Sequence, residues 1–179
     1  TPDMESPLSL TIATLNCNGI RASERRGFSD WLTRTRPDVL CLQEVPRRLF
    51  GGARVARFAR ACGLEWHGGH RGSGGTTILT SGRVECLGLS HHRLPVRWPD
   101  RTRGYAVARV AVPGGAEVSV ASVHLGLRAD ERVRHVQRIV SALPGLAGPD
   151  GPDRVPGHLV VAGDLNEEQG GQAFLTLVA

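Results

Sequence analysis

The segment that most constrains the fold of this chain is residues 158–166. Residues 158–162 are largely apolar and rich in Val and Leu, and a glycine ends the run. This length and composition predict a β-strand buried on both faces. Asp164 and Asn166 follow at a spacing of two, so their side chains point to the same side of an extended chain. The pattern predicts either a strand that delivers two polar groups to a site or a turn that simply ends the strand.

Two further predicted strands end in polar residues in the same way. Residues 8–15 alternate between apolar and polar side chains and are followed by Asn16 and Asn18, and the apolar residues 39–42 lead into Gln43 and Glu44. Open sheets that are covered by helices bind ligands beyond the carboxyl ends of their strands. We therefore expect these amide and carboxylate groups to gather at one end of a sheet.

The rest of the chain predicts a mixture of helices and strands, and hence an α/β (α+β) class. Apolar residues at helical spacing predict helices over 23–35, where Ser23 would be the N-cap, over 47–62 and over 129–143, and the apolar residues 174–179 are also expected to be helical. Two strand pairs are predicted as hairpins, 76–80 with 83–89 and 105–112 with 118–125. His124 ends the last of these strands. The polar segment 91–103 is predicted to be a loop, either solvated or facing a substrate.

The chain has 179 residues, 40% of them hydrophobic, which suits one domain with a substantial core. Its net charge is +5, and all 22 positive residues are arginine. Arginine side chains match phosphate oxygens, so the charge suits a polyanionic partner such as nucleic acid. An ordinary solvated surface in which arginine replaces lysine explains the composition equally well.

Several observations favour a cytoplasmic protein. The four cysteines have no C-x-x-C spacing, and Cys41 falls inside an apolar strand, so we expect reduced and mostly buried thiols. The sequence contains no run of 18 or more apolar residues, so no membrane span is predicted. The first residues do not resemble a signal peptide. Met4 is the only methionine and is the expected native start.

The strand ends together resemble the ordered motifs of the endonuclease/exonuclease/phosphatase superfamily. The matching motifs are Leu-Asn-Cys-Asn-Gly-Ile-Arg-Ala at 15–22, Leu-Gln-Glu at 42–44, Ser-Val-His-Leu at 122–125 and Gly-Asp-Leu-Asn at 163–166. The resemblance implies a four-layer αββα sandwich of two mixed β-sheets flanked by helices. Residues 4–179 would then be a single domain of this type.

The resemblance also implies roles for individual residues. Glu44 would be the main metal ligand, with help from Asn16, and Mg²⁺ or Mn²⁺ would be the metal. Asp164 would orient or activate the attacking water, and Asn166 would bind the phosphate or that water. A hard cation held by oxygen ligands is what attack on a phosphodiester requires, because it neutralises charge on the phosphoryl and leaving oxygens.

The motifs do not all point to the same branch of the superfamily. The residues around Asn16 look most like apurinic/apyrimidinic endonucleases, whereas the segment around His124 looks like pancreatic deoxyribonuclease and sphingomyelinase. In that second branch the histidine contacts the phosphate and can protonate the leaving group. Asn18, Arg21 and Arg103 are the candidate phosphate-binding residues. The resemblance thus leaves the substrate open between nucleic acid and a smaller phosphoester.

One departure from the family pattern concerns the residues after the Gly-Asp-Leu-Asn motif. Family members carry a further Asp and a Ser-Asp-His motif there, and the present sequence does not contain Ser-Asp-His. We therefore expect a domain truncated at its C-terminus that lacks the general-base histidine. Two functions follow as expectations: a metal-dependent phosphodiesterase, or a catalytically inactive, partner-dependent domain that binds nucleic acid or phosphate.

Overall fold

The computed structural model describes residues 9–25, 27–47, 49–143 and 158–179, and within them the chain forms five helices and eight strands. The helices are α1 (Ile20–Glu24), α2 (Phe28–Thr35), α3 (Gly51–Ala61), α4 (Ala129–Ala142) and α5 (Gln172–Val178). The strands are β1 (Ile12–Asn16), β2 (Val39–Gln43), β3 (Leu64–Trp66), β4 (Thr77–Ser81), β5 (Glu85–Leu94), β6 (Arg103–Ala111), β7 (Glu117–His124) and β8 (Leu159–Asp164).

The strands form two four-stranded sheets, each of mixed direction. The first sheet has the order β1-β2-β4-β3, in which β1 and β2 are parallel and the other pairs antiparallel. The second has the order β5-β6-β7-β8, in which only β7 and β8 are parallel. The predicted pairing of the strands near 105–112 and 118–125 is confirmed as β6 with β7.

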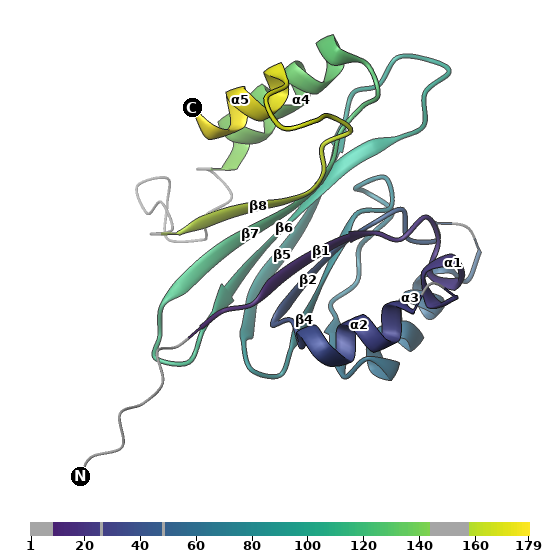
Figure 1. Cartoon of the computed structure of the whole chain (residues 1–179), viewed down its shortest axis with the longest axis vertical. Helices are drawn as coiled ribbons and strands as arrows, with labels where there is room; N and C mark the ends of the chain where they lie inside the picture. Colours follow the sequence, from purple (N-terminus) through teal and green to yellow (C-terminus); the bar gives the residue numbers. More distant parts are fainter. Residues whose placement is uncertain (1–8, 26, 48, 144–157) are drawn as a thin grey trace.

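The two sheets pack face to face, and helices cover both outer faces (Figure 1). Helices α2 and α3 cover the first sheet, where Phe58 and Leu42 belong to one buried cluster. Helices α4 and α5 cover the second sheet, with Ile139 at that interface. A third cluster, which contains Cys41 and Val120, lies between the sheets. The predicted four-layer αββα architecture is therefore confirmed.

Alternation along each strand decides which side chains face the other sheet. In β2, Leu40 and Leu42 point to the helices, whereas Val39 and Cys41 belong to the cluster between the sheets. We call the face of each sheet that contacts the other sheet its inner face. Because successive side chains point to opposite faces, every second residue of a strand lies on the inner face.

Three predictions of local structure are wrong. Strands β4 and β5 are not a hairpin, because β4 pairs with β2 and β3 in the first sheet and β5 begins the second. The predicted helix over 23–35 is two helices, and Ser23 lies inside α1, where its hydroxyl donates to the Cys17 carbonyl oxygen at 2.7 Å. The predicted loop over 91–103 is shorter, since β5 continues through Leu94 against β6.

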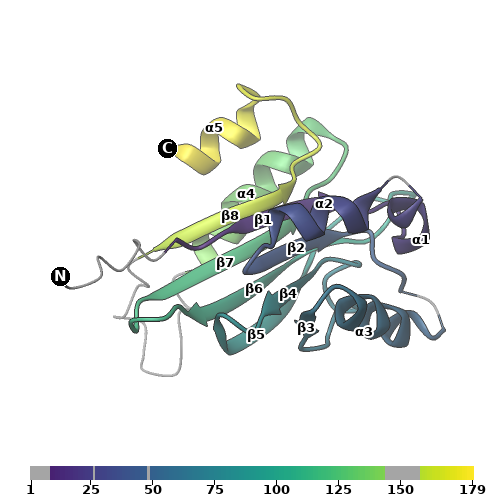
Figure 2. The same cartoon turned by 60° about the horizontal axis from the view of Figure 1, so that its bottom comes forward.

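The burial predicted for β8 is also wrong. Every residue of this strand is at least partly exposed, because β8 is the edge of the second sheet within the part of the chain that the structure describes. An apolar run indicates a strand but does not determine how many strands flank it. The side of β8 away from the first sheet is instead approached by α5 (Figure 2), and Val161 packs against the same buried cluster as Ala173.

None of the helices in the described residues is both long and apolar enough to cross a membrane.

Candidate active site

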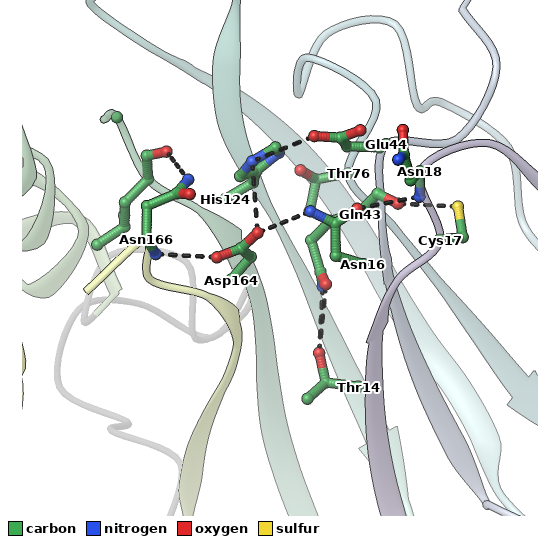
Figure 3. A network of polar contacts seen from close by, with 12 residues as sticks. Thr14, Asn16, Cys17, Asn18, Gln43, Glu44, Thr76, His124, Asp164 and Asn166 are labelled. Carbon is green, nitrogen blue, oxygen red and sulfur yellow. Dashed lines mark hydrogen bonds and ion pairs between the residues drawn. The ribbon is translucent and has the colours of Figure 1, made fainter. Parts of the chain in front are cut away.

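Strand alternation brings polar side chains together at one end of the space between the sheets. In β1, Ile12 packs between the sheets, so Asn16, four residues later, is also on the inner face. In β8, Val160 packs there, so Asp164 is on the inner face of the second sheet. His124 ends β7 directly beside Asp164, as its partner in the parallel register. Figure 3 shows these side chains pointing toward one another.

The Asp164 carboxylate is held through both of its oxygens. Nδ2 of Asn16 donates to Oδ2 at 2.7 Å, and the backbone N–H of Asn166 donates to Oδ1 at 2.9 Å (Figure 3). Hydrogen bonds to an ionised carboxylate are stronger than those between neutral groups. Asp164 is therefore fixed in orientation by groups from both sheets.

Asn166 is anchored to the chain beside His124. Its Nδ2 donates to the carbonyl oxygen of Leu125 at 2.9 Å, while its own N–H serves Asp164. The side-chain oxygen of Asn166 takes part in neither bond and can accept a hydrogen bond from water. The phosphate or water contact expected of Asn166 stays a prediction.

His124 lies between the two carboxylates of the site. Its Nε2 is 3.8 Å from Oε1 of Glu44 and 3.8 Å from Oδ2 of Asp164. The residue is 2% exposed, and burial, together with the positive charge of Arg103, lowers its pKa below the ordinary value, although Asp164 and Glu44 act in the opposite direction. The imidazole is therefore held mainly neutral between two acidic groups.

Glu44 directly follows β2 and has an unusual backbone conformation. Its φ of 59° is left-handed, and its side chain is 35% exposed. A carboxylate with this exposure can accept a cation, and Asn16 presents an amide oxygen nearby that already accepts from the N–H of Asn18 at 3.1 Å. A carbonyl oxygen has a second lone pair. These two oxygen donors fit a hard divalent cation, because Mg²⁺ is usually bound through one or two carboxylates and keeps several waters.

A denser set of ligands is not present in the part of the chain that the structure describes. No group of three or more His, Cys, Asp or Glu side chains there is arranged to hold a metal ion. Among the described residues, the groups placed to hold a cation are therefore the Glu44 carboxylate and the Asn16 amide oxygen.

Unusual backbone conformations concentrate at this site. Five described residues other than glycine have positive φ, and three of them are Asn18 (42°), Glu44 (59°) and Asn166 (50°). Each lies just beyond the carboxyl end of a strand. Left-handed backbone is uncommon outside glycine, above all for a residue such as Glu, and when observed it points to a functional constraint.

The three candidate phosphate-binding residues differ in their exposure and in their contacts. Asn18 is exposed next to Asn16. Arg103 begins β6, one position before the residue that pairs with His124, and its Nε is buried without a hydrogen-bond partner among the described residues. A buried guanidinium N–H without a partner is costly, and a bound anion would satisfy it. Arg21 lies in α1, and its side chain is outside the described residues.

A polar ladder behind the site was not predicted as such. Gln43 is fully buried on the inner face of β2, and its Nε2 donates to the hydroxyls of Ser122 at 3.0 Å and of Thr14 at 3.2 Å. It thereby ties β2 to β7 of the facing sheet and to β1 of its own. Alternation along β2 could have indicated this contact, because the side chain two positions after Cys41 points to the same face of the sheet.

The burial predicted for the cysteines is found at two of the four positions. All four are free; Cys17 and Cys41 are buried, whereas Cys62 and Cys86 are partly exposed. Burial raises the pKa of Cys17 to about 11 and that of Cys41 to about 12, so both remain thiols at neutral pH. A thiolate nucleophile is thereby excluded at these two positions.

The decisive comparison is with families of known sequences. The model of the Endonuclease/Exonuclease/phosphatase family matches residues 13–175, a range that includes all of the candidate site residues: Asn16, Asn18, Arg21, Glu44, Arg103, His124, Asp164 and Asn166. The chain belongs to this family. No curated protein matches it significantly in sequence.

Solved structures share the family fold. The chain superposes on D. rerio TDP2 in complex with a single-strand DNA product (TM-score 0.67, 22% identity, 92% of this chain and 63% of that one). It also superposes on ANGEL2, a 2',3'-cyclic phosphatase (0.68, 17%, 92% and 55%), and on the human Nocturnin catalytic domain with bound sulfate (0.65, 18%, 85% and 60%). The chain therefore spans less than two thirds of each of these three structures.

Proposed function

We propose that this family member hydrolyses phosphodiesters of nucleic acid by metal-assisted attack of water. The observation that carries the proposal is the Asp164 carboxylate, which is fixed through both oxygens and faces His124 at 3.8 Å. A carboxylate held in this way can accept a hydrogen bond from a water molecule and orient it for attack. No thiol or hydroxyl nucleophile is needed.

Each residue of the site has a role in this reaction. Glu44 and Asn16 would hold Mg²⁺ or Mn²⁺, which supplies charge neutralisation at the phosphoryl group. Asp164 orients the water, and the side-chain oxygen of Asn166 is available to accept a hydrogen bond from it. His124, in the tautomer with the proton on Nε2, donates to a phosphoryl oxygen or to the leaving oxygen.

Three observations support an anionic substrate. Arg103 has a buried Nε without a partner among the described residues, beside His124. The whole chain carries a net charge of +5. Among structures of the same fold, TDP2 was crystallised with single-strand DNA and Nocturnin with sulfate. Asn18 and Arg21 are the further phosphate contacts that we propose.

Hydrolysis assays test the proposal directly. We expect cleavage of DNA or RNA oligonucleotides with Mg²⁺ or Mn²⁺ and none with a chelator. Asp164→Asn keeps the side-chain volume but removes the charge, and should lower kcat by at least about a hundredfold. Asp30→Asn, an exposed position on α2, is the matched control and should behave as wild type. Equal rates for the two variants would exclude the proposed role of Asp164.

A second candidate function is binding without hydrolysis, in a domain that depends on a partner. It is favoured by one observation, the buried Nε of Arg103, which has no hydrogen-bond partner among the described residues and which a bound anion would satisfy without any reaction. In this case oligonucleotides or inorganic phosphate would bind, but no metal would produce turnover. A binding titration run beside the hydrolysis assay distinguishes the two functions.

A further inference from the structure

A concave region beside the site is lined by residues of both α1 and α3. It has a volume of about 700 Å³. Ile20 and Phe58 contribute apolar surface to its lining, and both are largely buried in the cluster below it. We call this region the α1/α3 groove.

Basic side chains dominate the charge of the groove. Its lining includes Arg25, Arg54 and Arg57, and Glu24 is the acidic residue among the lining residues. All three arginines are exposed, and no ion pair found within the described residues involves any of them. Like charges gathered without ion pairs repel one another. Their concentration in one hollow is typical of a surface that binds an anion.

The groove is continuous with the catalytic residues through Asn18. This residue lines the groove, while its backbone N–H donates to Oδ1 of Asn16 at 3.1 Å. The Nδ2 atom of the same Asn16 amide donates a hydrogen bond to Asp164 at 2.7 Å. A chain whose reacting phosphate lies at Asp164 can therefore run past Asn18 into the groove.

We propose that the α1/α3 groove binds the backbone phosphates of a nucleic-acid strand on one side of the scissile phosphate. The inference rests on the proposed function and narrows its substrate class to polymers. A small phosphoester would occupy only the residues around Asp164 and would leave the three arginines of the groove without an anion. An anionic bilayer is a poorer match, because a lipid surface cannot enter a hollow between two helices.

The mixture of groups in the groove also suits a strand. Guanidinium groups pair with phosphate oxygens through two parallel hydrogen bonds. The apolar surface of Ile20 and Phe58 provides contacts for sugars and bases that do not depend on base identity. Binding should therefore be steeply dependent on salt and weakly dependent on sequence.

The first experiment measures binding of a fluorescent 12-nucleotide single strand to the full chain, in EDTA, at several salt concentrations. Arg54→Ala/Arg57→Ala removes two groove charges. Arg34→Ala/Arg60→Ala removes two exposed charges from α2 and α3 that do not line the groove, so it matches the change in net charge. We expect at least about tenfold weaker binding for the groove variant at low salt, and a slope of log K against log salt that is smaller by about one to two. The control should keep the wild-type slope.

Circular dichroism establishes that both variants are folded; because all four positions are exposed, loss of folding is not expected. Equal affinity and slope in the two variants would overturn the groove proposal. So would a wild type that binds anionic phospholipid vesicles through Arg54 and Arg57 but does not bind the strand.

The second experiment separates this inference from the proposed function. The ratio of kcat/KM for the oligonucleotide to kcat/KM for bis(4-nitrophenyl) phosphate is compared between the two variants with Mn²⁺ present. A ratio that falls at least about fivefold in the groove variant alone supports the inference, since each lost phosphate contact weakens polymer binding. If wild type hydrolyses neither substrate, the proposed function fails, and the binding experiment still decides whether the groove holds a strand.

Discussion

Asn16 donates a 2.7 Å hydrogen bond to Asp164 across 148 positions of sequence. The first residue ends β1 of one sheet and the second ends β8 of the other. The bond therefore joins the two sheets at the open end of the sandwich. The orientation of the Asp164 carboxylate depends on how the sheets are packed, as well as on its own strand.

Removing this bond should cost both stability and activity. In a double-mutant cycle with Asn16→Ala and Asp164→Ala, we expect a coupling of about 1 kcal/mol in the free energy of unfolding, which is modest because the pair is exposed. Asn16→Ala alone should lower kcat more than tenfold, because the Asp164 carboxylate loses one of the two hydrogen bonds that fix its orientation. Urea unfolding and initial rates provide the two measurements. Additive single effects would show that the two residues act independently.

Glu44→Gln should weaken the binding of Mg²⁺ or Mn²⁺ more than any other single amide replacement in the site. The change keeps the shape of the side chain but removes the charged oxygen ligand, and an affinity loss of about tenfold or more is expected. Isothermal titration calorimetry measures it. Glu85→Gln, an exposed position at the start of β5, is the control. Unchanged metal affinity in Glu44→Gln would remove this residue from the metal site.

Gly163→Ala should displace β8 and with it Asp164. The glycine has a φ of 146°, and a Cβ there would overlap with the backbone of its partner Val123 in β7. We expect a loss of about 3 kcal/mol in stability and a loss of activity, because the strand must shift. Gly88→Ala in β5 of the same sheet is the control, since its Cβ would meet nothing within 4 Å. Thermal unfolding with parallel rate measurements tests both, and equal melting temperatures would contradict the prediction.

His91 should make the fold sensitive to acid. Burial and the neighbouring His70 and His92 lower its pKa from 6.5 to about 4. As the pH falls below 6.5, the unfolded chain takes up a proton that the folded chain does not, so the free energy of unfolding falls. The loss continues until about pH 4, where both states are protonated. Urea unfolding between pH 7 and pH 4 should therefore show a smaller pH dependence in His91→Gln than in the control His158→Gln, which removes an exposed imidazole. A pH dependence equal in both variants would contradict this assignment.

The sequence allowed the architecture, and the gathering of the polar strand-end residues, to be predicted because both depend on local patterns. Alternation in β1 and β8 places Asn16 and Asp164 on the inner faces, and the polar switch after each strand marks the end at which they meet. The family motifs added the four-layer arrangement of the sheets. These signals lie within short stretches of chain and do not depend on which strand pairs with which.

Pairing between distant segments could not be read in this way. The turn around Gly82 suits a hairpin, yet the chain leaves the first sheet after β4 and starts the second with β5. A turn motif determines a change of direction but not which strand a segment will pair with. The buried link from Gln43 to Ser122 likewise depends on the packing of two sheets, which only the three-dimensional structure supplies.

The left-handed backbone at Asn18, Glu44 and Asn166 has a consequence for how this sequence can evolve. Glycine adopts that conformation without steric cost, whereas other residues are less stable there by roughly 1 kcal/mol each. A library randomised at these three positions and selected only for folding should therefore drift toward glycine. The same library selected for cleavage should retain the amides and the carboxylate, so a thermostability screen without an activity filter would erode the site while improving the protein.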